Sequence, residues 1–308
     1  MSEQRQLPVP EGLAGERADV ALGRLLGFSR NQAAELLGSG GIRQDGEPLA
    51  KSDRLRAGSW LEIDMPAPRE AAPREPAQGL VVRYEDDDLL VVDKPVGVAV
   101  HASPGWLGPT VVDTLAASGY QLARSGPAER QGVVHRLDVG TSGVMLLAKS
   151  EVAYVHLKDA FRQRTVTRVY HAVVQGHMDP LRGTIDAPIG RHPGADYRFA
   201  VIADGKHAVT HYDTLEAMPG ASLLEVRLET GRTHQIRVHA SAMRHPCVGD
   251  LTYGADPVLA DKLGLRRQWL HAMRLQVAHP TSGDLLEVTS SYPADLDAAL
   301  QRLRAGTL

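Results

Sequence analysis

Asp138 is the residue of this 308-residue chain whose type and surroundings most directly suggest chemistry. It lies in the segment 132–150, GVVHRLDVGTSGVMLLAKS, where a short polar stretch separates two apolar runs. Residues 133–134 and 144–147 suit short buried strands, and residues 140–143 supply a turn between them. This arrangement presents the Asp138 carboxylate at the mouth of a sheet. There it can serve as a turn cap, a structural ion pair or a catalytic group.

Other reactive residue types occur in patterns that disfavour metal, hydrolytic or redox chemistry. His207 and His211 have the i,i+4 spacing of helical metal ligands, but they fall in a strand-like segment, where that spacing separates the rings, and it implies no third ligand. Ser142 lies in TSG, which differs from the G-x-S-x-G motif of a nucleophile elbow. The single cysteine, Cys247, is expected to be a small core residue. We therefore expect no metal site and no disulfide.

Two further side chains join Asp138 as chemical candidates. Tyr170 is a phenol in the strand-like segment 165–174, and Arg232 is a guanidinium at a junction between a strand and a helix. Thr233 is the expected cap of that helix. The sequence thus offers one acid, one phenol and one guanidinium, each in a short segment bounded by turn signals.

The elements that must position these residues predict an α+β domain over 80–308. Its sheet is expected to be mixed and largely antiparallel, with flanking helices. The expected strands cover 80–84, 89–93, 133–134, 144–147, 165–174, 184–185, 199–202, 208–215, 223–228, 270–279 and 285–290. The expected helices cover 111–117, a segment opened by Ser150 and ending near Arg164, a segment capped by Thr233, and 295–303.

The first part of the chain predicts a separate small domain over 15–65. Apolar residues at helical spacing predict one helix, and Ser29 with Gln32 fits a capping box that opens a second. A hairpin containing the Asp45-Gly46 turn signal follows. Residues 66–79 are rich in proline and alanine, which predicts a semi-extended linker that lets the two domains reorient.

Composition sets outer limits on function. The chain is 43% hydrophobic and contains no run of about 18 apolar residues and no secretory signal, so we expect a cytoplasmic protein without a membrane segment. The formal charge of −3 gives no global support for nucleic-acid binding. An RNA-binding surface, if present, must therefore be local.

Five ordered motifs stand out: HRLDVGTSGVMLLAK at 135–149, RVYHAVV at 168–174, LETGRTHQIRVHAS at 228–241, HPCVGDLTYG at 245–254 and LHAMRLQVAHP at 270–280. Together they resemble the RluA-type pseudouridine synthases over residues 80 to about 295. Through Arg30, Asn31 and residues 41–45, the preceding small domain resembles the S-four-type RNA-binding domain. That arrangement is typical of a branch acting on large-subunit ribosomal RNA.

The resemblance implies a cofactor-free isomerisation of uridine to pseudouridine. In the family a single aspartate, here Asp138, either attacks the anomeric carbon or removes a sugar proton to give a glycal, and the sequence does not choose between these routes. Arg232 matches the arginine that pairs with this aspartate. Tyr170 matches the tyrosine that stacks on uracil and accepts or relays the carbon 5 proton.

The same resemblance, together with residue positions, predicts further contacts. Arg136 is a candidate to fill the space left by an extruded nucleotide, with an ordinary salt bridge as the alternative. For His135 a structural hydrogen bond is an alternative to RNA contact. Leu147 and Ile236 are candidates to wall the uracil, with core packing as the alternative. The expected RNA-binding residues are Arg30, Arg43, Lys94, His135 and Arg136.

One departure and several rival functions accompany this interpretation. Val139 and Gly140 stand where many family members carry a lysine and an acid, which puts local RNA contact and target choice in doubt. The rivals are a non-catalytic RNA-binding or ribosome-assembly factor, a synthase acting on transfer RNA, and a base-excising glycosidase. We expect the chain to act on ribosomal RNA as a monomer.

Overall fold

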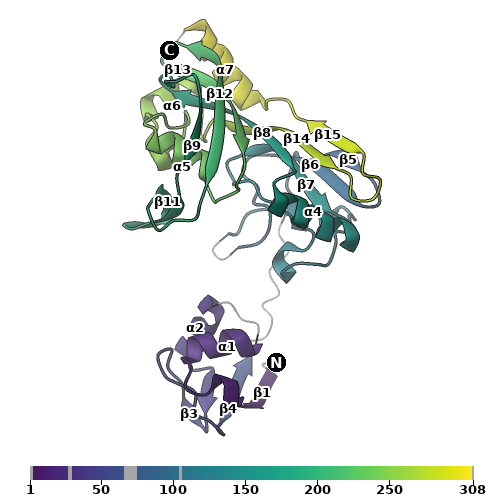
Figure 1. The fold of residues 1–308 in the computed structure, drawn as a ribbon, viewed down its shortest axis with the longest axis vertical. Coiled ribbons are helices and arrows are strands. Elements are labelled where there is room, and N and C mark those ends of the chain that lie inside the picture. The colour runs from purple at the N-terminus through teal and green to yellow at the C-terminus, as the bar shows by residue number, and fades with distance from the viewer. Residues whose placement is uncertain (1–2, 27–29, 66–74, 104–105, 307–308) are drawn as a thin grey trace. The chain divides into compact units, whose positions relative to one another are not determined.

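The chain forms two compact units, Met1–Ala72 and Pro73–Leu308. Figure 1 draws the small unit in purple and the large unit in blue to yellow. The computed structural model describes residues 3–26, 30–65, 75–103 and 106–306. Each unit has its own hydrophobic core.

In the described residues, the small unit is a four-stranded antiparallel sheet with two α-helices and one short 3-10 helix, Glu11–Leu13. Its strands follow the order β1-β4-β2-β3. The Asp45-Gly46 turn joins β2 to β3 with positive φ angles of 53° and 83°, as the sequence predicts. The Ser29–Gln32 capping box lies outside the described residues. The elements are β1 (Glu3–Pro8), α1 (Ala18–Leu26), α2 (Arg30–Gly38), β2 (Ile42–Gln44), β3 (Glu47–Pro48) and β4 (Trp60–Met65).

Strand β1 corrects the predicted start of this unit at residue 15. It pairs with β4 along its whole length, from Glu3 opposite Met65 to Pro8 opposite Trp60. Its residues 4–6 are polar and exposed, so they lack the alternating apolar pattern that marks a strand. Backbone pairing with β4 makes it a strand, and only the folded unit brings that partner alongside.

The large unit is built on a nine-stranded mixed sheet. Its main path is β5-β6-β7-β14-β8-β13-β12-β9, and β15 pairs with β14. Within this sheet the pair β7 and β14 is parallel and the other pairs are antiparallel, which confirms the predicted mixed, largely antiparallel character. The strands are β5 (Val81–Glu85), β6 (Leu89–Lys94), β7 (Ser142–Ala148), β8 (Thr167–Gln175), β9 (Arg182–Asp186), β12 (Val209–Met218), β13 (Ala221–Leu228), β14 (Leu270–Ala278) and β15 (Leu285–Thr289).

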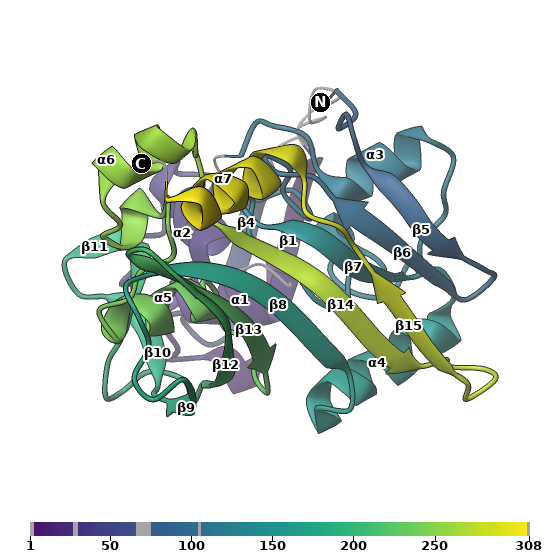
Figure 2. The ribbon, with the colours of Figure 1, turned by 90° about the horizontal axis from the view of Figure 1, so that it is seen from above.

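A glycine allows the close approach of β7 and β14 at the centre of the sheet. Gly143 has a φ of 117°, and a Cβ there would lie 2.2 Å from the carbonyl oxygen of Ala272. Only glycine fits such a site, where another backbone comes this close. Figure 2 shows β7, β14 and β8 side by side. The approach brings the start of β7, and the loop before it, against the start of β14.

In the described part of the large unit, five α-helices and a separate hairpin accompany the sheet. Ser150 caps α4 as predicted, because its Oγ accepts from the backbone N–H of Ala153. The helices are α3 (Val111–Ala117), α4 (Glu151–Gln163), α5 (Gln235–Ala242), α6 (Pro257–Leu263) and α7 (Ala294–Ala305), and the hairpin pairs β10 (Ile189–His192) with β11 (Ala195–Val201). The sequence interpretation missed α6 and β10. It also expected a strand at 133–134, where Val133 forms a single bridge to Leu147.

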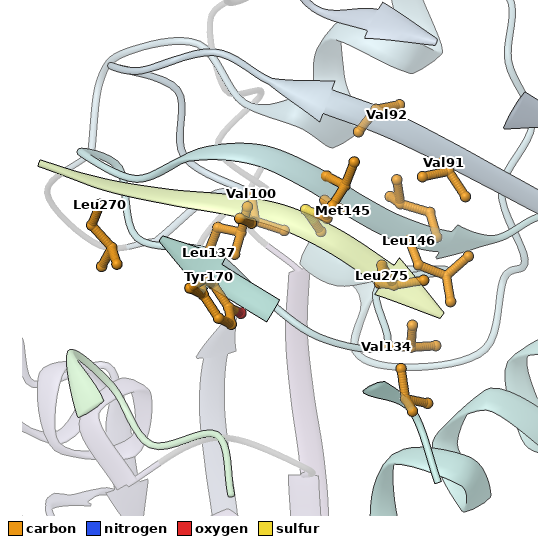
Figure 3. Close-up of a cluster of buried hydrophobic side chains, with 14 of the residues drawn as sticks. Val91, Val92, Val100, Val134, Leu137, Met145, Leu146, Tyr170, Leu270 and Leu275 are labelled. Atoms are coloured by element: carbon orange, nitrogen blue, oxygen red, sulfur yellow. The ribbon is translucent and has the colours of Figure 1, made fainter. Parts of the chain in front are cut away.

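The core of the large unit surrounds its central strands. All seven residues of β7 are buried, because the strand is covered on both faces. Figure 3 shows part of this cluster, with Tyr170 and Leu137 next to each other at one end. The segment just before β7 is therefore anchored in the core. Among the helices of the described residues, none is long and apolar enough to cross a membrane.

Candidate active site

Asp138 lies in a short loop that runs directly into β7. The turn falls at residues 139–140, and the N–H of Thr141 donates to the carbonyl oxygen of Asp138 at 3.0 Å. Ser142 and Gly143, expected in the turn, instead begin the strand. The loop therefore ends in a fully buried strand, and this anchor fixes the position of the Asp138 backbone.

Lys94 supports this loop from behind. Its side chain is 0% exposed, and Nζ donates to the carbonyl oxygens of Val98 at 2.8 Å and Pro95 at 2.9 Å. The carbonyl oxygen of Val139 lies 3.5 Å from the same nitrogen. Burial lowers the pKa of Lys94 to about 7, although the charge of Asp138 opposes this shift. The prediction that Lys94 contacts RNA is therefore wrong, because a fully buried amine cannot reach a polyanion outside.

Arg267 holds the next part of the loop. Its Nη1 donates to the carbonyl oxygen of Gly140 at 3.2 Å and to Ser142 Oγ at 3.0 Å. The rest of the guanidinium forms a fork with Asp295 of α7, at 2.7 and 2.9 Å. Gln268 fills the space beside Gly140, where a Cβ would lie 2.5 Å from the Gln268 amide oxygen. A side chain at position 140 would therefore require Gln268 to move.

The Asp138 carboxylate faces a cavity of about 1240 Å³. Its side chain is 16% exposed, and Oδ2 lies 3.6 Å from Arg237 Nη1 and 3.9 Å from His234 Nε2. Both partners belong to the start of α5, three residues apart, so they project from one face of its first turn. The site thus presents one partly buried carboxylate with a guanidinium and an imidazole beside it.

The predicted pairing of Arg232 with Asp138 is wrong. Arg232 lines the same cavity but is exposed, and its Nε donates to the carbonyl oxygen of His207 at 2.9 Å. The backbone N–H of Arg232 donates to Gln235 Oε1 at 2.9 Å. Both Arg232 and Arg237 lie in the motif at 228–241. Arg237 follows His234 by three residues, a helical spacing that places both side chains on one face, and this spacing could have identified Arg237 as the partner of Asp138.

The start of α5 also differs from the predicted cap. His234, with a left-handed φ of 57°, is the capping residue, and its side chain makes no cap hydrogen bond. The buried side chain of Gln235 fixes this end instead. It accepts from Thr230 Oγ1 at 2.8 Å and donates to the carbonyl oxygen of Val209 at 2.9 Å. Thr233 is therefore not the cap, and the buried side-chain amide of Gln235 holds the turn in place.

Tyr170 lines the cavity from β8 and is 6% exposed. Figure 3 shows its ring beside Leu137, the residue before Asp138. Burial raises the pKa of the Tyr170 phenol, Arg168 lowers it, and the charge of Asp138 raises it further. The hydroxyl therefore stays protonated at neutral pH.

The remaining predicted residues are spread between the cavity, the core and the small unit. His135 lines the cavity, but its Nε2 accepts from the N–H of Leu146 at 2.9 Å, and its ring stacks on Phe161 at 4.9 Å. Burial lowers the pKa of His135 to about 3, so the ring is neutral. This contact fits the structural alternative. Arg136 is exposed at the cavity, where a nucleotide contact is sterically open.

The two proposed uracil-walling residues behave differently. Ile236 lines the cavity, whereas Leu147 is fully buried in the core and contributes nothing to the cavity wall, so the prediction for Leu147 is wrong. In the small unit Arg43 is exposed on β2. The Arg30 side chain lies outside the described part of the chain.

The histidine pair and the cysteine have ordinary structural surroundings. His207 Nε2 lies 3.3 Å from Asp186, and His211 Nε2 lies 2.8 Å from Glu229. The described residues contain no group of three or more potential metal ligands. Cys247 is buried, as expected for a core residue, and burial raises its pKa to about 12.

Comparison with known proteins identifies the family of this chain. The family model described as RNA pseudouridylate synthase matches residues 88–242. An uncharacterized RNA pseudouridine synthase of Mycobacterium bovis is 58% identical over 303 residues, which cover 97% of this chain and 98% of the relative. The ribosomal large subunit pseudouridine synthase D of Xanthomonas campestris is 41% identical, covering 98% of this chain and 93% of the relative.

A solved structure, human RNA pseudouridylate synthase domain containing 1, has a TM-score of 0.58 and 31% identity, covering 73% of this chain and 90% of that one. The chain belongs to the RNA pseudouridine synthase family, as a member of the RluA type. It is an isomerase that converts uridine to pseudouridine in RNA.

Proposed function

We propose that this chain isomerises uridines of large-subunit ribosomal RNA and that Asp138 is its catalytic carboxylate. The observation that carries the proposal is the position of Asp138, whose carboxylate faces the cavity within 4 Å of two nitrogen donors. Support for the substrate comes from relatives named for the large ribosomal subunit, including one from Nitrosomonas europaea at 39% identity.

The reaction needs one reactive group near the sugar. The bond from the anomeric carbon to N1 of uracil breaks, the base turns, and a new bond joins the same carbon to C5. The proton of C5 moves to solvent, and N1 takes up a proton from solvent. Atoms and oxidation state balance without a second substrate. Asp138 can attack the anomeric carbon or remove the proton at C2′, and both routes require an ionised carboxylate. The Nη1 of Arg237 lies 3.6 Å from this carboxylate and orients it.

Tyr170 supplies an aromatic face beside this carboxylate. A buried ring at the cavity wall can stack on uracil while the base turns. Because burial raises the pKa of the Tyr170 phenol, the protonated hydroxyl is suited to relaying the C5 proton rather than accepting it as a phenolate.

With a net charge of −3, an RNA-binding surface must be local, and the rim of the cavity is that surface in this proposal. Asp159 and Glu229 are the acids of this rim, and both are ion-paired with arginines. Basic side chains outnumber these two acids, and in this proposal they bind the phosphate backbone of the RNA. Arg136 is the proposed filler of the gap left by an extruded uridine. The basic residues that line the cavity away from Asp138 are Arg130, Arg136, Lys158, Arg162, Arg164, Arg168 and Arg232.

The small unit is proposed to be an S-four-type domain that contacts RNA backbone. Its two helices precede the β2–β3 hairpin and β4, and Arg43 projects from β2 into solvent. The unit has its own core, so it can act as a separate binding element.

The test is an in vitro assay of the full chain with ribosomal RNA. Asp138→Asn should abolish pseudouridine formation while RNA binding, measured by filter retention, stays within about threefold. Asp159→Asn is the matched control, because Asp159 is a cavity-lining carboxylate at the exposed rim. Substantial activity of Asp138→Asn would refute the proposal. Release of free uracil by the wild type would identify a glycosidase. Modification of transfer RNA but not of ribosomal RNA would show that transfer RNA is the substrate.

A further inference from the structure

The loop at 245–254, HPCVGDLTYG, has no role in the site described so far. It follows α5 and carries Asp250 and Tyr253, which are 2% and 3% exposed. Both side chains contact the residues that flank Asp138 without touching Asp138 themselves. A buried carboxylate and a buried phenol behind a reactive carboxylate call for a chemical explanation.

Asp250 fixes the orientation of the Arg237 guanidinium. Arg237 Nε and Nη2 donate to the two oxygens of Asp250 at 2.6 and 2.8 Å. This bidentate fork leaves Nη1 as the nitrogen that faces Asp138. The ring of Tyr253 lies 4.8 Å from the centre of the same guanidinium and supports its face. A planar guanidinium held at two edges and one face has little freedom to turn away from Asp138.

Tyr253 fixes the tautomer of His234 by a parallel route. The N–H of Phe199 donates to the Tyr253 hydroxyl oxygen at 3.1 Å, and His234 Nδ1 lies 2.8 Å from that oxygen. Burial lowers the pKa of His234, so the ring is neutral and carries one N–H. A lone pair on Nε2 would repel the Asp138 carboxylate at 3.9 Å, so the proton belongs on Nε2. Nδ1 then accepts from the Tyr253 O–H.

We propose that Asp250 and Tyr253 are positioning residues for Asp138, Asp250 through Arg237 and Tyr253 through His234. The inference rests on the proposed catalytic role of Asp138. Both nitrogen donors approach Oδ2 of Asp138. The arrangement therefore anchors one carboxylate oxygen and directs Oδ1 toward the sugar of the bound uridine.

The first test uses Tyr253→Phe in the full chain, which keeps the ring against Arg237 and removes only the hydroxyl. We expect kcat to fall by about tenfold, the loss typical when a hydrogen bond that orients a reactive group is removed, while KM stays within about twofold. Tyr292→Phe is the matched control, because Tyr292 makes the same kind of contact with His171 Nδ1 and does not line the cavity. Its kcat should match the wild type.

A second readout does not depend on turnover. Imidazole ¹⁵N spectra distinguish the two neutral tautomers, and His234→Gln identifies the His234 signal. We expect the Nε2–H form in the wild type and a mixture of tautomers in Tyr253→Phe. An Nδ1–H form in the wild type would overturn the Tyr253 route.

Asp250→Asn tests the other route and keeps the proposal falsifiable if Tyr253→Phe unfolds. The amide keeps one acceptor oxygen but loses the charge and the second acceptor, so kcat should fall at least as far as in Tyr253→Phe with KM little changed. Wild-type kcat in both Asp250→Asn and Tyr253→Phe would overturn the inference while leaving Asp138 intact as the catalytic residue. Activity of Asp138→Asn would instead defeat the proposed function itself.

Discussion

The two sides of the Asp138 loop use positive charge in different ways. On the cavity side, Arg237 approaches the carboxylate itself at 3.6 Å. On the core side, Lys94 and Arg267 are buried and bind backbone carbonyl oxygens of the loop, at Val139 and Gly140. The first arrangement acts on the charge of the reactive group, and the second fixes the backbone that carries it.

This difference shows that the atom contacted, more than the charge of the side chain, determines what a basic residue does here. Lys94 donates to three carbonyl oxygens, whereas Arg267 also forms a fork with Asp295. A buried cation that binds only carbonyl dipoles keeps much of its desolvation cost. We therefore expect substitutions on the cavity side to change turnover, and those on the core side to change stability and its dependence on pH.

The largest effect is expected for Arg237→Lys. Lysine keeps the charge but loses the planar fork to Asp250, so the cation no longer has a fixed direction toward Asp138. The single-turnover rate should fall by about 100-fold, as for a small misplacement of a reactive group. Arg232→Lys is the control, and its rate should remain within about threefold. Equal losses in the two variants would remove the distinction between these arginines.

The core side is tested by Lys94→Met through the pH dependence of unfolding. The pKa of Lys94 is 10.5 in its ordinary state and about 7 in the folded protein. Between these values the unfolded chain binds more protons, so stability rises with pH there, and the cost of burying the charge is fully present below pH 7.

From pH 6 to pH 9 the wild type should gain about 2 to 3 kcal/mol of unfolding free energy relative to Lys94→Met. Urea unfolding at the two pH values measures this change. A difference between the two proteins that does not vary with pH would mean that Lys94 does not titrate in this range.

The smallest effect is expected in the small unit, where Arg43 is exposed and has no place in either side of the Asp138 loop. Arg43→Ala should weaken binding to structured RNA by a few fold and lower the salt dependence by about one counterion. Turnover at saturating RNA should not change. The control is Lys51→Ala, which removes an equal charge from another exposed position. Equal weakening by both would indicate a nonspecific charge effect.

The sequence predicted the mixed sheet, the α4 cap and the neighbouring strands β14 and β15 because each has a local signal. It also predicted that Asp138 and Tyr170 matter, and both line one cavity although 32 positions separate them. It chose Arg232 over Arg237 because one motif contains both arginines, and the deciding contact with Asp250 comes from a later loop. A local sequence pattern cannot predict a contact with a residue that is distant in sequence and becomes a neighbour only in the folded chain.

Burial explains the other differences. Lys94 follows the predicted strand 89–93 and precedes a proline, a pattern that predicts an exposed strand end. In the structure it is the last residue of β6 and is buried, with its Nζ against the loop of Asp138. Leu147 lies in a strand buried on both faces, so its sequence gives no sign of which residues reach the cavity. Residues 4–6 are polar, and β1 forms only because β4 offers an open edge.

The most direct test of the central claim is a nucleotide-resolution map of pseudouridine in ribosomal and transfer RNA. The map should compare cells that lack the protein with the same cells carrying the wild type or Asp138→Asn. We predict that specific large-subunit ribosomal positions lose pseudouridine, that the wild type restores them, and that Asp138→Asn restores none. Restoration of the same positions by Asp138→Asn would contradict the account.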